Sequence, residues 1–359
     1  MDQPPTVLDP AGTSPVVPGP VAPPSNHSML LWGGVALSTL ILIGVAYFFF
    51  LVPGNTATPK VYRVGVLNAL DYFSPFVDGF KQRMTELGYV EGENIVYDVQ
   101  KGPSPIGNQD ILKKFVDDKV DLILVFPTEA SIEAKEITQG TEIPVISGAV
   151  TTEANNLVES LQNPGGNLTG VRFPVPEISV KRFDLLHEIA PKATRFWMPH
   201  LKDYPTVPIV LEATRPKAEA LHITLIETPF STPDEMTTYL DAHRNDPGMD
   251  AILLMSEPIS ILPLFSNQIY AFAEAHRIPI AGVIVQDDDR GPVFGVVPSS
   301  FEMGTLAAPM ADKIFKGIPA GTIPIATPEL VFEINYKVIQ RLGLTVSEDL
   351  LSTASRIVH

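Results

Sequence analysis

The chain has 359 residues, 25 of them basic and 41 acidic, with a formal net charge of −16 and no cysteine. The only charged residues before Lys60 are Asp2 and Asp9. Residues 60–359 therefore carry all 25 basic residues and 39 of the acidic ones, a net charge of −14. That acidity repels a phosphate backbone and argues against nucleic-acid binding. The missing cysteine excludes disulfides, thiolate metal sites and a Cys nucleophile.

The first 60 residues predict three segments. Residues 1–28 hold eight prolines and two charges, a composition typical of a disordered stub. Residues 29–52 are uncharged and mostly apolar, and as a helix they would reach ~36 Å, enough to cross a hydrocarbon core of ~30 Å. We therefore expect a single transmembrane anchor there, followed by a linker at 53–60. A cleaved signal peptide is the alternative, but it requires a basic start and a shorter apolar run.

The orientation of the expected anchor rests on two opposing observations. No Lys or Arg precedes the apolar run, whereas Lys60 and Arg63 follow it, which by the positive-inside rule favours a cytoplasmic body. The identity that the body's sequence suggests, given below, favours the other side of the membrane. We expect a single-pass protein of the cell membrane whose body is extracytoplasmic.

The body at 61–359 alternates short apolar runs with amphipathic segments. The unbroken runs LILVF and AILLM are typical of parallel strands covered on both faces. Strands are predicted at 62–67, 95–99, 122–126, 144–147 and 168–172, and in a second series at 195–198, 223–226, 251–254, 279–283 and 293–297. Two such series predict an α/β fold with two doubly wound, Rossmann-like lobes.

Two helices have clear boundary signals. An apolar stripe from Phe73 to Leu87 follows Ser74-Pro75 and precedes Gly88, which predicts a helix between them. Ser299 and Glu302 form a capping-box pattern at the start of a second apolar stripe, which Gly317 ends.

Motifs for chemistry are absent from the sequence. It contains no G-x-x-x-x-G-K-[ST], G-x-G-x-x-G, H-E-x-x-H or G-x-S-x-G pattern, and its seven His are scattered. Asp287-Asp288-Asp289 lacks the regularly spaced oxygen ligands of a cation site, so we interpret it as a charged surface loop. The sequence therefore predicts no enzyme activity, no metal and no cofactor.

Several segments resemble the substrate-binding proteins of ABC transporters in the tryptophan/tyrosine-type family. The resemblance extends over essentially all of 60–359. Its most specific parts are G-x-x-x-G-x-N at 88–94, PGGNLTG at 164–170 and INxxxxxxLG at 334–343. It implies the type 1 periplasmic-binding fold, with three crossovers and a ligand enclosed between the lobes. The implied division is about 61–170 with 284–320 for lobe 1, and about 171–283 with 321–359 for lobe 2.

The resemblance also implies partners and a mode of action. The body would act as a monomer that captures a small solute for an ABC permease and an ATPase on separate chains, anchored in the membrane through residues 29–52. The chain departs from the family pattern at Thr151-Thr152, at Glu257-Pro258-Ile259 and near Val296, where the family often has a tyrosine. Since these are ligand-facing loops in the family, the resemblance implies the fold more firmly than the ligand.

Candidate ligand-binding residues follow the predicted strands, because ligands of such sheets bind at the carboxyl ends. A helix beginning near Thr128 would offer N–H groups to a ligand carboxylate, Glu257 or Asp287 would hold an amine, and Tyr204 or Phe73 would stack on an apolar side chain. The full set of candidates is Asn68, Asp71, Phe73, Thr128, Glu129, Gly148, Thr151, Tyr204, Glu257 and Asp287. The family resemblance suggests an aromatic or other apolar amino acid as the ligand.

A sensory role is the alternative function. An anchored ligand-binding domain could signal to a membrane partner, although the sequence contains no recognisable output domain. A DNA-binding repressor of the same fold is excluded by the acidic charge and the expected membrane helix.

Overall fold

The computed structural model describes residues 19, 60–104, 106–152, 156–287 and 289–359. The expected stub, the anchor at 29–52 and the linker up to residue 59 lie outside the described residues, as does Asp288. Among the described residues, no helix is long and apolar enough to cross a membrane. The chain divides into two units at Pro59 and Lys60, and the unit Lys60–His359 is described below.

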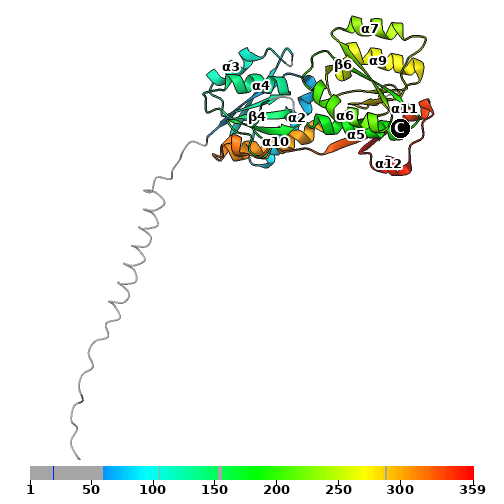
Figure 1. Cartoon of the computed structure of the whole chain (residues 1–359). Coiled ribbons are helices and arrows are strands. Elements are labelled where there is room, and N and C mark those ends of the chain that lie inside the picture. The colour runs from blue at the N-terminus through cyan, green and yellow to red at the C-terminus, as the bar shows by residue number, and fades with distance from the viewer. Residues whose placement is uncertain (1–18, 20–59, 105, 153–155, 288) are drawn as a thin grey trace, which may run out of the picture. The chain divides into compact units, whose positions relative to one another are not determined.

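A five-stranded, fully parallel sheet forms the centre of the first lobe. Its strands, in spatial order, are β2 (Ile95–Lys101), β1 (Tyr62–Asn68), β3 (Leu122–Phe126), β4 (Val145–Val150) and β5 (Leu168–Arg172). The lobe's helices are η1 (Asp71–Phe73), α2 (Ser74–Glu86), α3 (Gln109–Asp117), α4 (Thr128–Ile137), α10 (Ser300–Phe315) and η2 (Ala320–Thr322). In Figure 1, α3 and α4 cover one face of the sheet and α2 and α10 the other.

Strand β3 shows why this sheet needs helices on both faces. Its five residues are all buried, and they alternate between two apolar clusters. Leu122, Leu124 and Phe126 belong to the cluster that includes residues of α2 and α10, whereas Ile123 and Val125 pack with α3 and α4. The prediction from the run LILVF is confirmed.

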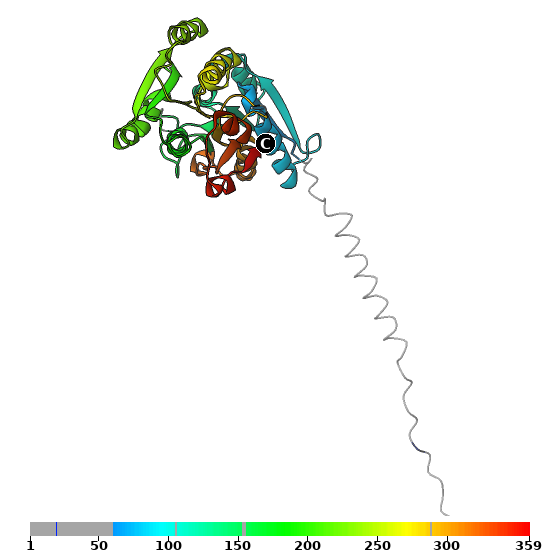
Figure 2. The ribbon, with the colours of Figure 1, turned by 90° about the vertical axis from the view of Figure 1, so that its right-hand side faces the viewer.

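The second lobe contains a seven-stranded sheet. Its strands, in spatial order, are β12 (Arg356–Val358), β11 (Leu330–Asn335), β10 (Phe294–Pro298), β9 (Ile280–Gly282), β8 (Ala251–Leu253), β6 (Arg195–Leu201) and β7 (Thr224–Phe230). Only the pair β10–β11 is antiparallel. The edge strand β7, in green, lies at one outer side of the unit in Figure 2.

Helices also cover both faces of this second sheet. Residues of α5 (Val175–Ile189) and α6 (Val207–Ala220) pack on the face that holds Phe196 and Met198. Residues of α7 (Pro233–Ala242) and α9 (Pro263–His276) pack on the face that holds Trp197. The remaining helices of the lobe are α8 (Pro258–Ile261), α11 (Tyr336–Leu342) and α12 (Glu348–Ser352).

The chain passes between the lobes three times, after β5, after β10 and before β11, as the resemblance implied. One boundary needs correction, because the sequence analysis expected residues from 284 onward in lobe 1. Strand β10 instead pairs with β9 and β11, so the chain returns to lobe 1 only with α10. Strands β11 and β12 were not predicted, since one is half-exposed and the other has three residues.

Helices α2 and α10 approach each other closely. A Cβ atom on Gly79 would lie 2.1 Å from the carbonyl oxygen of Phe301, and one on Gly304 would lie 2.1 Å from that of Phe76. Only glycine fits such backbone contact. Half of the predicted capping box is observed, because the Ser299 side chain accepts the N–H of Glu302 at the start of α10.

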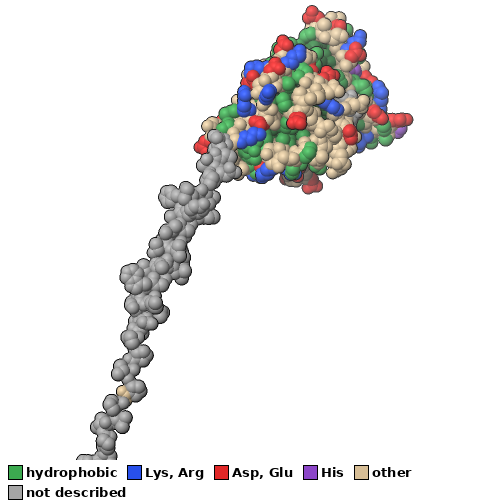
Figure 3. Space-filling view, turned by 90° about the vertical axis from the view of Figure 1, so that its left-hand side faces the viewer, with side chains coloured by type: hydrophobic (Ala, Val, Ile, Leu, Met, Phe, Trp, Pro, Cys, Tyr) green, Lys and Arg blue, Asp and Glu red, His purple; other side chains and the backbone are tan. Residues whose placement is uncertain are grey.

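Charged side chains of both signs are interspersed over the face of the unit shown in Figure 3. Many charged side chains of the unit form ion pairs near its surface, such as Lys114 with Asp98 at 3.2 Å and Lys217 with Asp184 at 2.7 Å. Solvent-exposed pairs of this kind contribute about 0–1 kcal/mol each, so they affect stability little.

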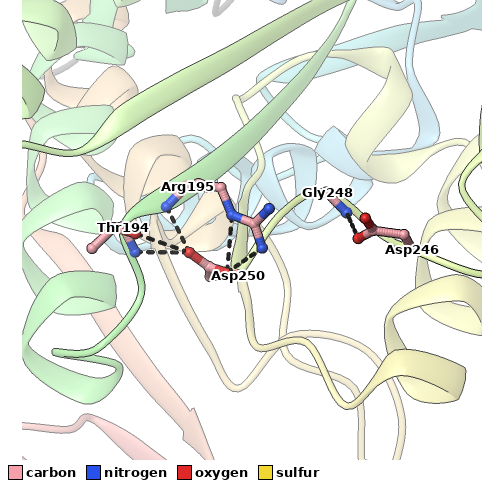
Figure 4. A network of polar contacts seen from close by, with 5 residues as sticks. All are labelled: Thr194, Arg195, Asp246, Gly248 and Asp250. Atoms are coloured by element: carbon pink, nitrogen blue, oxygen red, sulfur yellow. Dashed lines mark hydrogen bonds and ion pairs between the residues drawn. The ribbon is translucent and has the colours of Figure 1, made fainter.

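The amino ends of β6 and β8 are joined by Asp250 (Figure 4). One carboxylate oxygen accepts the N–H groups of Thr194 and Arg195 at 3.0 and 2.9 Å, and the other pairs with the Arg195 guanidinium at 2.7 Å. The Arg195 guanidinium holds the pKa of Asp250 below its usual value. The amino end of the sheet is therefore held by hydrogen bonds and an ion pair within the chain, whereas the carboxyl end borders a cavity.

Candidate functional site

A cavity of about 660 Å³, its open mouth included, lies at the carboxyl ends of strands from both sheets. The residues that line it follow β1, β3, β4, β5, β6, β8 and β9: Leu70, Tyr72, Phe73, Pro127, Thr128, Glu129, Ala149, Thr151, Phe173, Val175, Tyr204, Thr206, Ser256, Glu257, Pro258, Ile261 and Val283. Parallel strands place these loops together, as expected for doubly wound sheets.

Six of the ten candidate residues line this cavity. They are Phe73, Thr128, Glu129, Thr151, Tyr204 and Glu257. The other four, Asn68, Asp71, Gly148 and Asp287, are not among the lining residues, and their contacts explain why.

Two of the four excluded candidates follow β1 but have other roles. The Asn68 amide donates to the Ser74 hydroxyl at 3.1 Å, and its oxygen accepts the N–H of Leu70 at 3.2 Å, so this side chain holds the turn that follows the strand. Asp71 is exposed and pairs with Lys101 at 2.7 Å. Both predictions are corrected, because the polar groups are used within the loop or face solvent.

The other two excluded candidates lie in different surroundings. Gly148 is inside β4, where a Cβ would lie 2.8 Å from the Phe126 ring, so it serves close packing. Asp287 pairs with Arg356, which also binds Glu333 on the neighbouring strand. Because Arg356 belongs to the unpredicted strand β12, this partner could not be predicted from the sequence.

Thr128 joins the carboxyl ends of β3 and β4. Its hydroxyl donates to the carbonyl oxygen of Ala149 at 3.0 Å and accepts the N–H of Thr151 at 3.0 Å. Thr128 is also the first residue of α4, whose first turn includes Glu129. The amino end of that helix therefore borders the cavity, and its N–H groups and dipole favour a negatively charged group there.

Glu257 follows β8 of the second lobe and is buried at the cavity, with 3% of its surface exposed. One carboxylate oxygen, Oε2, accepts the N–H of Leu201 at 2.9 Å, whereas Oε1 is buried without a hydrogen-bond partner. Burial raises the pKa of Glu257 to about 8, and the bond from Leu201 opposes this only in part. Glu257, predicted from the sequence as a candidate to hold a ligand amine, thus lies buried at the cavity.

Tyr204 and Glu129 approach each other from different lobes. Tyr204 follows β6, and Glu129 belongs to α4. Burial raises the pKa of Tyr204 well above its usual value, and the Glu129 and Glu257 carboxylates raise it further. The described lining thus contains two carboxylates and no Lys, Arg or His. A positively charged ligand group would find acidic side chains there and would favour the ionised form of Glu257.

Two hydroxyls at the cavity also lack partners. Thr206 Oγ1 and Ser256 Oγ are buried without a hydrogen bond in the described structure. Thr206 precedes α6, but its side chain does not cap that helix. An unsatisfied buried polar group costs about 1–3 kcal/mol, so these atoms would gain from hydrogen bonds to a ligand or to ordered water in the cavity.

Aromatic rings form much of the remaining wall. Tyr72, Phe73, Phe173 and Tyr204 line the cavity, and the Phe73 ring lies 5.0 Å from that of Tyr72 and 6.4 Å from that of Phe173. Phe173 and Val283 were not predicted, although Phe173 directly follows the strand predicted at 168–172 and Val283 ends the one predicted at 279–283. The strand-end rule would have found both had it been applied to apolar residues as well as polar ones.

Arg182 lies next to this site and was also missed. It is fully buried on α5, and its guanidinium donates to the carbonyl oxygens of Leu254 at 3.0 Å and of Val296 at 2.6 and 3.1 Å. Burial lowers its pKa to about 9. Strand β9 ends at Gly282 between β8 and β10, so Arg182 supplies the donors that β9 no longer provides.

Comparisons with known proteins agree with this architecture. The profile of the family described as ABC transporter substrate binding protein matches residues 64–358. The chain is 25% identical over 300 residues to a tyrosine-binding protein of Clostridioides difficile, covering 81% of this chain and 83% of that protein. No group of His, Cys, Asp and Glu that could hold a metal ion occurs in the described part of the chain.

Solved structures show the same fold. A Streptococcus pneumonia ABC domain in complex with L-Trp superposes with a TM-score of 0.71 at 21% identity, covering 83% of this chain and all of that chain. A ligand-free, open substrate-binding protein with adhesive properties from Clostridium difficile gives a TM-score of 0.64 at 22% identity, covering 82% of this chain and 99% of that one.

Proposed function

The chain belongs to the ABC transporter substrate-binding protein family, and on that premise we propose that its cavity captures an aromatic amino acid. As a member of this family it is a binding protein and not an enzyme. The observation that carries the choice of ligand is the unpartnered carboxylate oxygen of Glu257 at the cavity. A ligand ammonium would pair with that oxygen and stabilise the charged form of the side chain.

The rest of the lining matches the other parts of an aromatic amino acid. The amino end of α4 at Thr128 suits the ligand carboxylate, on the lobe opposite Glu257. The rings of Phe73, Phe173 and Tyr204 offer surfaces for an aromatic side chain. The relatives support the same class, since one is described as tyrosine-binding and another was solved with L-Trp.

The partners and location of the chain form a second part of the proposal. As the binding component of an importer, it would deliver its ligand to a permease and an ATPase on separate chains. We propose that residues 29–52 hold it in the cell membrane as a single-pass anchor, with the binding unit extracytoplasmic and monomeric. The unbroken run of uncharged residues supports this anchor.

Isothermal titration calorimetry with matched ligands tests the ligand proposal. L-tyrosine and L-tryptophan are compared with 3-(4-hydroxyphenyl)propanoate, which lacks the ammonium group, and with tyramine, which lacks the carboxylate. Loss of the ammonium should weaken binding about 10-fold or more, as for a hydrogen bond to a charged group. Equal affinity for L-tyrosine and the propanoate would remove Glu257 from the proposed role.

A matched variant serves as the control. Asp287→Asn alters the other carboxylate that the sequence suggested for an amine, and that residue lies on the exposed surface outside the cavity lining. Its affinity for L-tyrosine and L-tryptophan should equal that of the wild type.

A further inference from the structure

Three unpartnered oxygens lie on two neighbouring loops of lobe 2. Thr206 follows β6, and Ser256 and Glu257 follow β8, the strand beside β6 in the sheet. Glu257 Oε2 accepts the N–H of Leu201, the last residue of β6, at 2.9 Å and so ties the two loops together. All three residues line the cavity, and Thr206 Oγ1, Ser256 Oγ and Glu257 Oε1 are buried without a partner.

The local sequence explains why the Thr206 hydroxyl is left free. Threonine at a helix start usually accepts the N–H of the second or third helical residue. In α6 the second residue is Pro208, which has no N–H. Thr206 also has helical backbone angles, φ −87° and ψ −12°, where a capping residue is usually extended, and its side chain makes no capping bond. By contrast, buried hydroxyls nearby are satisfied, because Thr214 donates to Val210 at 2.8 Å and Ser260 donates to Met255 at 2.6 Å.

We propose that Thr206, Ser256 and Glu257 together form a cradle for a primary ammonium group and make the site selective against N-methylated ligands. The proposal rests on the proposed function, since it assumes that the cavity binds an ammonium-bearing molecule. A primary ammonium has three N–H donors and no acceptor. The cradle offers it three oxygens, one of them on a carboxylate.

N-methylation distinguishes this cradle from binding by the aromatic rings alone. Each methyl group removes one donor and leaves one cradle oxygen unpaired. A cage of aromatic rings would instead favour a methylated cation, as in sites for quaternary ammonium ligands. The lining contains four aromatic residues, so binding by an aromatic cage is the alternative to the cradle. The cradle predicts tighter binding of the unmethylated ligand, and the aromatic cage predicts tighter binding of the methylated one.

Calorimetry on the full-length chain in detergent tests the order of affinity. L-tyrosine and L-tryptophan are each compared with their Nα-methyl and Nα-trimethyl derivatives. One lost hydrogen bond to a charged group should weaken binding about 10-fold or more, and trimethylation should abolish it. Equal or tighter binding of the methylated ligands overturns the cradle while leaving an aromatic amino acid as the ligand.

Two pairs of variants test the individual oxygens. Thr206→Val and Ser256→Ala should weaken L-tyrosine or L-tryptophan binding about 10-fold each and reduce the preference for the unmethylated ligand. Thr214→Val and Ser260→Ala alter partnered hydroxyls outside the cavity lining, and they should keep that preference. Unchanged affinity in both cradle variants contradicts the proposal.

The melting temperature of the unliganded chain gives a readout that needs no ligand. Because their hydroxyls are unpartnered, Thr206→Val and Ser256→Ala should leave it unchanged or raise it, whereas Thr214→Val should lower it. If both amino acids fail to bind, the proposed function is wrong in its choice of ligand. The cradle is then tested by the thermal shift that methylammonium and tetramethylammonium produce. Methylammonium should give the larger increase in melting temperature, and equal shifts from the two ions overturn the proposal.

Discussion

The carboxylate of Glu257 accepts the backbone N–H of Leu201 at 2.9 Å, which joins the loop after β8 to the end of β6. This bond fixes the carboxylate in a buried position while using only one of its oxygens. The arrangement pre-positions an acceptor and leaves the unliganded protein with an unpaired polar group. The Glu257 carboxylate should therefore strengthen ligand binding and lower the stability of the unliganded protein.

Glu257→Gln should weaken binding of L-tyrosine or L-tryptophan by about 1.5–3 kcal/mol, the range for a hydrogen bond to a charged group. The amide oxygen can still accept the Leu201 N–H, so the loop should keep its position. Calorimetry at pH 8 compares this variant with wild type and with Asp287→Asn. An affinity equal to that of the wild type would contradict the assigned role.

The unliganded wild type should lose stability relative to Glu257→Gln as the pH rises from 5 to 8. The folded chain holds the Glu257 proton up to a pKa of about 8, whereas the unfolded chain releases it near the usual 4.5. Between these values only the folded state keeps the proton, so its stability falls by at most about 1.4 kcal/mol per pH unit and levels off above pH 8. Urea unfolding of both proteins across this range measures the difference, and parallel curves would contradict it.

Ligand binding near pH 7 should release up to one proton. The empty cavity holds Glu257 in its neutral form, and an incoming ammonium favours the carboxylate. The facing titratable groups are Tyr204, whose raised pKa keeps it protonated, and Glu129 on α4. Calorimetry in phosphate and in Tris should give different apparent enthalpies, and Glu257→Gln should remove that difference. Identical enthalpies for the wild type would count against proton release.

Arg182→Met should lower the free energy of unfolding by about 2–5 kcal/mol. The substitution leaves the carbonyl oxygens of Leu254 and Val296 buried without donors, at about 1–3 kcal/mol each. Arg195→Met is the control, since it removes a half-exposed ion pair and should cost about 1 kcal/mol or less. Urea denaturation measures the free energy of unfolding of both variants. Equal decreases would contradict a stabilising role for the buried hydrogen bonds of Arg182.

Gly79→Ala should destabilise the chain by about 1–3 kcal/mol or more, because its Cβ would lie 2.1 Å from the backbone oxygen of Phe301. The two helices would have to move apart. At Gly88 an added Cβ meets nothing within 4 Å, so Gly88→Ala incurs only the strain of a positive φ of 93°. Thermal unfolding should rank the Gly79 variant lower, and the reverse order would contradict close α2–α10 packing.

Local patterns predicted much of this structure because they depend on neighbouring residues alone. The apolar run at Leu122–Phe126 is as expected, and so is the cap by which the Ser299 side chain accepts the N–H of Glu302. The position of Thr128 and Glu257 at strand ends also placed them at the cavity. These features follow from period, capping and the geometry of parallel sheets.

Features that depend on distant partners were not predictable in this way. Asp287 was assigned to the site because it follows a predicted strand. Its partner Arg356 could not be predicted, since it lies on a three-residue strand with no pattern of its own. The burial of Glu257 depends on the loop from Leu201 across the sheet. The sequence around Arg182 does not indicate that its guanidinium would donate to the carbonyl oxygens of Leu254 and Val296, which belong to distant segments.

The return of the chain to lobe 1 with α10 also constrains how the protein folds during synthesis. Strands β1 to β5 leave the ribosome first, but the face that carries Phe76 and Phe80 stays uncovered until α10 emerges, after β6 to β10. The second sheet is complete only after β11 and β12 have been synthesised, and both follow α10 in the sequence. Both lobes therefore complete their cores late and almost together, and until then the nascent chain exposes apolar surface that a chaperone would need to shield.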